Sequence, residues 1–273
     1  MAKRLKKLFL ASALCTAVAC AEEGGVKPVT EEKTTVEAVS MFDGESLKGW
    51  HTSEQDTPFF SVKDGEIRGG DLEKNVPRNV WLVSDKSYEN FEMTFSIKFT
   101  DGGGDPLLKN SGIQVRSLVM GGGICGYQID AGPTHPKTSI NGGLGYWGNI
   151  WDEHRRGALV TASNQDQLME SVKQFDEWND YKIICDGPNI KTWVNGILAH
   201  DYTEDNPKIA ADGIIALQAH KGGKFLVHFK DLMIKELPAT EGSPKWTDEG
   251  IIKGRVKKAN KPKKPKNKKK GKK

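Results

Sequence analysis

The sequence predicts an all-β protein, a β-sandwich of the jelly-roll type, and three observations point to it. Apolar side chains recur with a period of two through most of residues 40–238, as in strands with one buried face. Glycine is abundant, at 30 of 273 residues, and turn signals separate the apolar segments every ~8–12 residues. No segment shows the sustained 3.6-residue period of a long helix, so a sandwich is the expected architecture.

The strand expected at 91–100 shows the clearest alternation, with apolar residues at odd positions and polar residues at even ones. Three strands should follow within 181–202, separated by the turns Asp186-Gly187-Pro188-Asn189 and Asn195-Gly196. Two more are expected around 215–220 and 225–234. The second of these should contain a β-bulge near Lys230-Asp231, because the apolar register shifts there.

Residues 1–20 have the layout of a secretory signal peptide, with a basic start, a short apolar stretch and small residues before Cys20. We therefore expect export to the periplasm, the outer membrane or the cell surface. Cleavage would either release a soluble protein or leave Cys20 as a lipidated first residue, in which case the lipid would be the membrane contact. Residues 21–39 lack periodicity and should form a flexible tether.

Residues 239–273 are expected to form an exit segment and a disordered, Lys-rich tail after the domain at 40–238. The last 21 residues, Lys253–Lys273, hold 13 of the 40 Lys and Arg residues and no acid, so the body of the chain is acidic. This distribution argues against a basic domain that binds specific nucleic acid. The tail could still contact an anionic polymer. No run of ~18 apolar residues is present to span a membrane.

Cys125 and Cys185 are the cysteines that remain within the body of the chain. An oxidising compartment would permit a disulfide between them. Two small, unpaired core residues are an equally acceptable interpretation, because a domain of this size does not need a covalent link.

Polar side chains spaced two residues apart occupy the second face of three expected strands. The pairs are Gln114 with Arg116, Gln128 with Asp130, and Gln218 with His220. Amide, guanidinium and carboxylate groups suit sugar hydroxyls, which donate and accept hydrogen bonds together. The alternative is the solvated outer face of an ordinary sandwich.

The loop at 142–156 concentrates aromatic, acidic and basic side chains, including Trp147, Trp151 and Glu153. Aromatic rings can stack on sugar rings, and acids can transfer protons, so we favour a functional loop over a merely solvated one. Its match to G-x-G-x-x-G lacks a surrounding βαβ unit, which excludes dinucleotide binding. The scattered histidines do not define a metal site by spacing.

Short motifs along 41–237 carry a resemblance to a known bacterial family. In order they are MFDGESLKGW (41–50), VKDGEI (62–67), YENFE (88–92), NSGIQVR (110–116), GYQID (126–130), WDE (151–153), EWN (177–179), VNG (194–196) and GIIALQAH (213–220). The sequence resembles the secreted 3-keto-disaccharide hydrolases, also described as 3-keto-alpha-glucoside 1,2-lyases and 3-keto-2-hydroxy-glucal hydratases. The resemblance implies a concanavalin A-like jelly roll.

The resemblance also implies chemistry on a saccharide oxidised at C3, with cleavage by C2 proton abstraction and β-elimination, hydration, or both. The candidate catalytic residues are Asp130, Glu153 and His220. The candidate substrate-binding residues are Arg116, Gln128, Trp147, Trp151 and Gln218. A divalent metal ion could supply the electrophile, with His220 as an alternative metal ligand.

Two other functions fit the same sequence. One is a non-catalytic, lectin-like carbohydrate-binding module, because jelly rolls host lectins and enzymes alike. The other is an envelope-associated interaction protein that uses its basic tail. Asp130 is the single carboxylate of its strand, which argues against glycoside hydrolysis by two paired carboxylates.

Overall fold

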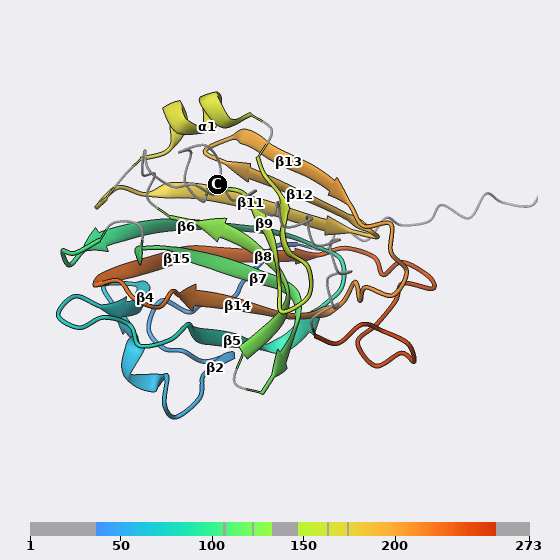
Figure 1. Ribbon diagram of the computed structural model, residues 1–273, viewed down its shortest axis with the longest axis horizontal. Coiled ribbons are helices and arrows are strands. Elements are labelled where there is room, and N and C mark those ends of the chain that lie inside the picture. The colour runs from blue at the N-terminus through green and yellow to red at the C-terminus, as the bar shows by residue number, and fades with distance from the viewer. Residues whose placement is uncertain are drawn as a thin grey trace, which may run out of the picture. The chain divides into compact units, whose positions relative to one another are not determined.

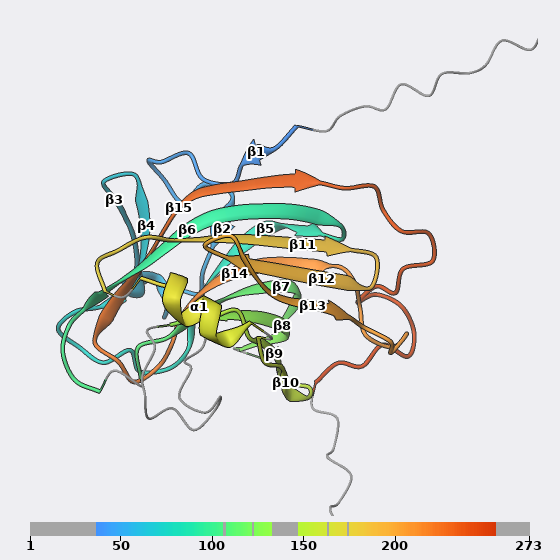
Figure 2. The same ribbon diagram turned by 90° about the horizontal axis from the view of Figure 1, so that it is seen from above.

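The computed structural model describes residues 37–254, except for 106–107, 122, 133–146, 163 and 174. The described chain is a sandwich of two antiparallel sheets, as predicted (Figures 1 and 2). The expected signal peptide, most of the expected tether and the Lys-rich tail lie outside the described residues.

The first sheet contains most of the predicted strands (Figure 1). Its order is β13 (Ile197–Thr203), β12 (Asn189–Val194), β11 (Asn179–Asp186), β6 (Phe91–Asp101), β15 (Phe225–Glu236), β4 (Glu66–Asp71) and β3 (Phe60–Lys63), and β1 (Val39–Ser40) pairs with the C-terminal part of β15. The two predicted turns join β11 to β12 and β12 to β13.

The second sheet carries the polar pairs singled out in the sequence. Its order is β10 (Gly157–Val160), β9 (Ile150–Glu153), β8 (Gly123–Ala131), β7 (Ser111–Met120), β14 (Gly213–Ala219), β5 (Val80–Tyr88) and β2 (Trp50–His51). The 3₁₀-helix η1 (Thr57–Phe59) and the short α1 (Gln165–Ser171) complete the described elements. None of the helices in this part of the chain is both long and apolar enough to cross a membrane.

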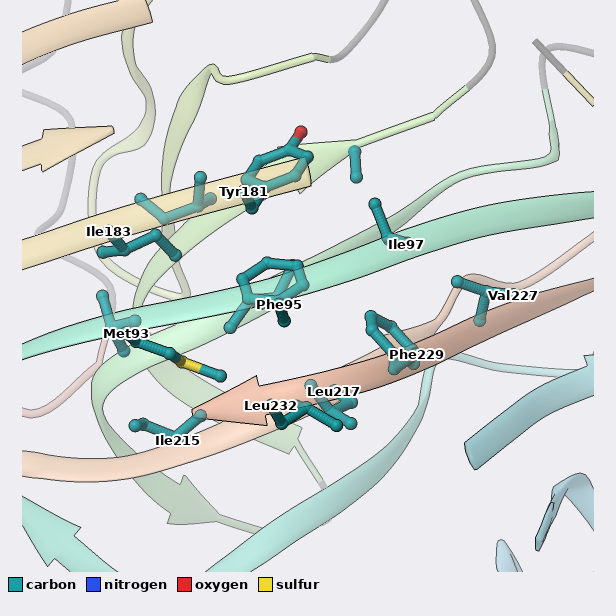
Figure 3. Close-up of a cluster of buried hydrophobic side chains, with 14 of the residues drawn as sticks. Met93, Phe95, Ile97, Tyr181, Ile183, Ile215, Leu217, Val227, Phe229 and Leu232 are labelled. Atoms are coloured by element: carbon teal, nitrogen blue, oxygen red, sulfur yellow. The ribbon is translucent and has the colours of Figure 1, made fainter. Parts of the chain in front are cut away.

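The hydrophobic core lies between the two sheets. In β6 the odd positions from Phe91 to Phe99 are buried, which confirms the alternation predicted from the sequence. Figure 3 shows side chains of β6, β11 and β15 gathered with those of β14 from the other sheet. Within this core the rings of Phe95 and Tyr181 stack, with their centroids 5.1 Å apart. Burial of these apolar surfaces is the main favourable contribution to folding.

The predicted bulge in β15 is present. The pairing of β15 with β6 shifts between Lys230 and Met233, and Asp231 has a φ of +54°. The extra residue changes the alternation, so Phe229 before the bulge and Leu232 after it are both buried in the core.

The segment after β15 is not the loose exit segment expected from its composition. Trp246 is buried and packs with Cys125 and Ala210, and its Nε1–H donates to the backbone oxygen of Arg116 at 3.3 Å. Backbone hydrogen bonds join Ala211 N to Pro244 O and Ile252 N to Lys208 O. One large aromatic side chain therefore docks an otherwise polar segment on the body, which composition alone does not show.

Cys125 and Cys185 are both free and buried, so the structure supports the unpaired alternative. Cys125 lies in the small cluster beneath Trp246, whereas Cys185 belongs to the main core. Burial raises the pKa of the Cys185 thiol to about 11, which keeps it protonated and unreactive at neutral pH.

Candidate functional site

Three glutamine side chains lie together on the outer face of the second sheet. Gln114 of β7 is opposite Gln128 of β8, and Gln218 of β14 completes the group. Their strand neighbours Ile113, Ile129 and Leu217 point into the core, so the glutamines point away from it. All three are nevertheless buried, at 0–4% exposure, so the alternative of a solvated face is wrong here.

Hydrogen bonds fix the orientation of the central amide. Gln114 and Gln218 both donate from Nε2 to Gln128 Oε1, at 3.0 and 3.1 Å, and Ser117 Oγ donates to Gln114 Oε1 at 2.8 Å. The Gln128 carbonyl oxygen is thereby occupied, and its Nε2 donates to Asp130 Oδ1 at 2.7 Å. Gln128 thus positions Asp130, because its own polar atoms already have protein partners.

Gly112 leaves the space that this amide needs. It lies opposite Asp130 in the β7–β8 pairing, and a Cβ at this position would be 2.6 Å from Gln128 Cγ. Any side chain there would displace the Gln128 amide from its place above β7. The glycine of the NSGIQVR segment therefore serves the site by its small size.

Asp130 is a buried carboxyl group with a raised pKa. Burial raises its pKa to about 8, although the hydrogen bond from Gln128 acts in the opposite direction, and the charge of Glu153 adds to the increase. Its backbone is held across the sandwich, because Tyr181 donates its hydroxyl to the Asp130 backbone oxygen at 2.8 Å. A carboxyl group that is largely neutral at pH 7 can donate a proton.

Strand β9 brings two further predicted residues to the same face. Trp151 is opposite Gln128 and Glu153 is opposite Gly126, so both follow the alternation of the outer face. Both side chains are partly exposed, unlike the glutamines. The site thus combines a buried polar floor with an accessible aromatic ring and a second carboxylate.

His220 follows β14 directly and extends the row that contains Gln218. Its backbone N–H donates to the Asn110 backbone oxygen at 3.2 Å. Burial lowers the pKa of His220, so the imidazole is neutral at pH 7. The structure thus gathers Gln128, Asp130, Trp151, Glu153, Gln218 and His220 on one face.

Arg116 does not lie on this face, which corrects the prediction. A bulge shifts the pairing of β7 with β8 within 115–118, and Arg116 has a φ of +49°. Its guanidinium group is buried at the end of the sandwich, where it donates to Glu89 O at 2.9 Å, Gly187 O at 2.7 Å and Asn90 Oδ1 at 2.9 Å. Arg116 therefore joins two turns at the end of the sandwich, away from the glutamine side chains.

The prediction that Trp147 binds substrate is also wrong, because Trp147 lies in the core. It is 3% exposed, and its ring meets Phe99 edge to face with the centroids 6.1 Å apart. The chain turns inward here, as Gly148 N–H donates to the Asp130 backbone oxygen at 3.0 Å. The indole is buried between the sheets, where the loss of water contact stabilises the fold, and it cannot stack on a sugar.

The remaining charges of the predicted loop form a structural network. Asp152 is fully buried and accepts hydrogen bonds from Arg155 Nε at 2.7 Å and Arg156 Nε at 2.5 Å. Arg156 also pairs with Glu204 at 2.6 Å, and Tyr127 donates its hydroxyl to the same carboxylate at 2.5 Å. Burial alone would raise the pKa of Glu204, but the hydrogen bonds from Arg156 and Tyr127 lower it to about 2.

Sequence reasoning missed two polar residues at this face, Asn110 and Ser117, and it did not include Gln114 among the candidate binding residues. Gln114 belongs to a pair already seen in the alternation of its strand, and Asn110 lies on the same alternation, two steps before Gln114. Ser117 could not be found, because only the β7 bulge turns its Oγ toward Gln114.

The described residues of this site do not fit a divalent metal ion. The described residues contain no group of three or more His, Cys, Asp or Glu side chains placed to hold one. The floor of the site offers neutral amides instead of the anionic oxygens that hard cations prefer. No chemical step is therefore assigned to a metal.

Comparison with known proteins places this geometry in context. The sequence model of the 3-keto-alpha-glucoside-1,2-lyase-like domain matches residues 37–235. A predicted glycosyl hydrolase from Parabacteroides distasonis shares the fold, with a TM-score of 0.51 and 19% identity over 74% of this chain and 94% of its own. The carbohydrate-binding module CBM66 from Bacillus subtilis gives a TM-score of 0.49 and 14% identity over 69% and 96%. A search of curated proteins gave no match.

Proposed function

Because this chain belongs to the family of 3-keto-alpha-glucoside-1,2-lyase-like domains, we propose that it is a carbohydrate-active enzyme that cleaves 3-keto-glycosides. The observation that carries the proposal is the buried carboxyl group of Asp130, held by an oriented amide and largely neutral at pH 7. On the neighbouring strand, Trp151 is opposite Gln128 and Glu153 is opposite Gly126, so both lie on the same face as Asp130.

The proposed reaction needs proton transfers and no oxidant. The C3 carbonyl acidifies the hydrogen on C2, and a base removes it to give an enolate. The enolate electrons then form the C1–C2 double bond as the C1–O bond breaks, and the departing oxygen takes a proton from an acid. Addition of water to the resulting enone gives net hydrolysis.

The site offers a group for each of these roles. Asp130 is the proposed acid, because its raised pKa lets it hold a proton at neutral pH. Glu153 is the proposed base, since it is the partly exposed carboxylate of the same face. The Gln218 amide is the proposed donor to the enolate oxygen, and Trp151 is the proposed stacking ring.

Turnover of matched substrates tests the proposal. The wild-type protein should cleave 3-keto-glucosides and leave the unoxidised parent glucosides intact, as followed by mass spectrometry. Asp130→Asn should lower kcat by about 100-fold or more, the usual effect of removing a positioned acid. Asp205→Asn, an exposed position away from the sheet face, is the control and should retain full turnover.

Two results would contradict the proposal. Equal cleavage of oxidised and parent glucosides would show ordinary glycosidase chemistry. Binding of both sugars without any turnover would instead identify a lectin-like module.

We also propose that the protein is exported, on the basis of residues 1–20, and anchored through a lipid on Cys20. The wild-type protein should then partition with membranes and Cys20→Ser should not. Soluble behaviour of both proteins would remove the lipid anchor from the proposal.

A further inference from the structure

Two buried polar atoms on the site face lack a hydrogen-bond partner. In the described part of the chain, Asn110 Oδ1 and His220 Nδ1 are both buried without one. The neighbouring glutamines, by contrast, bind one another through their amides. Buried polar groups in proteins are nearly always hydrogen-bonded, so unused capacity at a candidate site indicates where a ligand binds.

The sheet register places these two side chains next to each other. β14 pairs with β7 through Ala216 opposite Gln114 and Leu217 opposite Ile113, which sets His220 opposite Asn110. The backbone hydrogen bond from His220 N to Asn110 O, at 3.2 Å, agrees with this pairing. Residues directly opposite in an antiparallel pair have Cβ atoms about 4.5–5.5 Å apart and share a face.

The backbone on both sides of this pair is anchored. Before Asn110, the fully buried Lys109 pairs with Asp101, and its Nζ lies 5.2 Å from the centroid of the Phe175 ring. After His220, Lys221 N–H donates to Asn79 Oδ1 at 3.1 Å. The two side chains are therefore carried by fixed chain segments, which reduces the entropy lost when a ligand binds.

We propose that Asn110 and His220 form a subsite that binds two neighbouring hydroxyl groups of one sugar ring. This inference rests on the proposed saccharide site. The Asn110 amide oxygen accepts a hydrogen bond from one hydroxyl, and His220 Nδ1 donates to or accepts from the next. Sugar hydroxyl groups suit Asn110 and His220 because a hydroxyl both donates and accepts hydrogen bonds. An ion would suit them less, because the uncharged Asn110 and His220 side chains would leave its charge uncompensated.

The neutral state of His220 agrees with this assignment. Burial lowers the pKa of the imidazole, so one ring nitrogen carries a proton and the other has a free lone pair at pH 7. The Lys221 backbone and the Lys221 charge are the other groups that act on the titration of this ring, in opposite directions. The subsite therefore holds no net charge when the sugar arrives.

Calorimetric titration with methyl glucoside, its 3-keto form and its monodeoxy analogues tests the subsite. Asn110→Ala should weaken binding of the complete sugars by about tenfold or more, a loss of about 1.4 kcal/mol. One deoxy analogue should bind the wild type and Asn110→Ala with equal affinity, because that analogue lacks the hydroxyl group that bonds to Asn110. Asn110→Asp keeps acceptor oxygens and should retain most of the affinity. Thr94→Ala, on the first sheet, is the control and should bind like the wild type.

The possible results separate this inference from the proposed function. Equal affinity of the wild type and Asn110→Ala for every sugar, with 3-keto turnover intact, would overturn the subsite and keep the enzyme. Asn110-dependent binding without turnover would keep the subsite and remove the enzyme. Binding that is lost in chelator would overturn the subsite in favour of a metal, and no binding of any sugar would overturn both proposals.

Discussion

Asp130 shows how the surroundings of one residue set its chemistry. The sequence supplies a carboxyl group on an alternating strand, but its protonation depends on its burial beside Gln128. The hydrogen bond from the amide favours the charged form, and burial outweighs it. The residue is thus a neutral acid at pH 7, in contrast to Glu204, whose buried carboxylate is kept charged by Arg156.

The raised pKa of Asp130 predicts a pH-dependent stability. Between about pH 4 and pH 8 the unfolded chain releases the Asp130 proton while the folded protein keeps it. The contribution of Asp130 to the free energy of unfolding therefore falls as pH rises through this window, by about 1.4 kcal/mol per pH unit at most. Asp130→Asn removes this loss, so its stability relative to the wild type should increase from pH 5 to pH 8 in urea unfolding.

Asp205→Asn serves as the matched control for this measurement, because Asp205 is exposed. Its stability relative to the wild type should show no comparable increase over the same range. A relative stability of Asp130→Asn that stays constant between pH 5 and pH 8 would show that Asp130 is ionised in the folded protein.

The bulge in β7 is the element that decides the composition of the site. It turns Arg116 toward the end of the sandwich and brings Ser117 Oγ to Gln114. Two glycines of neighbouring strands make room for it. A Cβ at Gly126 would lie 2.1 Å from Ser117 Oγ, and one at Gly213 would lie 2.3 Å from Ser117 O.

Gly126→Ala should therefore destabilise the protein and disturb the amide cluster. Gly126 has a φ of +147°, and the added methyl group must displace Ser117 in addition to straining the backbone. We expect a loss of about 2–4 kcal/mol in the free energy of unfolding, together with reduced turnover.

Gly65→Ala is the control for backbone strain alone. Gly65 also has a positive φ, +73°, but nothing lies within 4 Å of its added Cβ. Gly65→Ala should lower the free energy of unfolding by about 1 kcal/mol and leave turnover unchanged. Equal losses in the free energy of unfolding for Gly65→Ala and Gly126→Ala would show that the contact with Ser117 adds no destabilisation beyond backbone strain.

At the scale of the whole molecule, the folded body extends beyond the last strand. The segment after β15 is joined to the body by the burial of Trp246 and by Asn90, whose Nδ2 donates to Pro238 O at 2.7 Å and Thr240 Oγ1 at 2.9 Å. Asn90 also accepts from Arg116, so the buried guanidinium and this segment belong to one network. The sequence that follows, 255–273, is basic, whereas the body of the chain is acidic.

Two truncations should separate these parts. Removal of 255–273 should leave the melting temperature and turnover unchanged and abolish salt-sensitive binding to an anionic polymer such as heparin. Removal of 238–273 also deletes Trp246 and should destabilise the protein by several kcal/mol, because it exposes the cluster around Cys125. Both can be followed by thermal unfolding and by a salt titration of polymer binding. Unchanged polymer binding after the shorter deletion would show that the tail is not its source.

Much of the fold was accessible from the sequence, because strand periodicity is a local property. The alternation at 91–100, the Asn195-Gly196 turn and the register shift near Lys230 each predicted the structure correctly. The docking of Trp246 was not accessible, since a single aromatic residue in a polar segment does not reveal the surface that it covers.

The sequence by itself determined which side chains face the core where a strand alternates without a bulge, and therefore that Gln128, Asp130 and Gln218 share the other face. Only the tertiary structure decided that this face is buried, that Arg116 and Trp147 leave it, and that Asn110 joins His220 there. The physical reason is that alternation follows from the geometry of one strand. Burial, the bulge in β7 and the pairing of Asn110 with His220 arise from contacts between segments far apart in the chain.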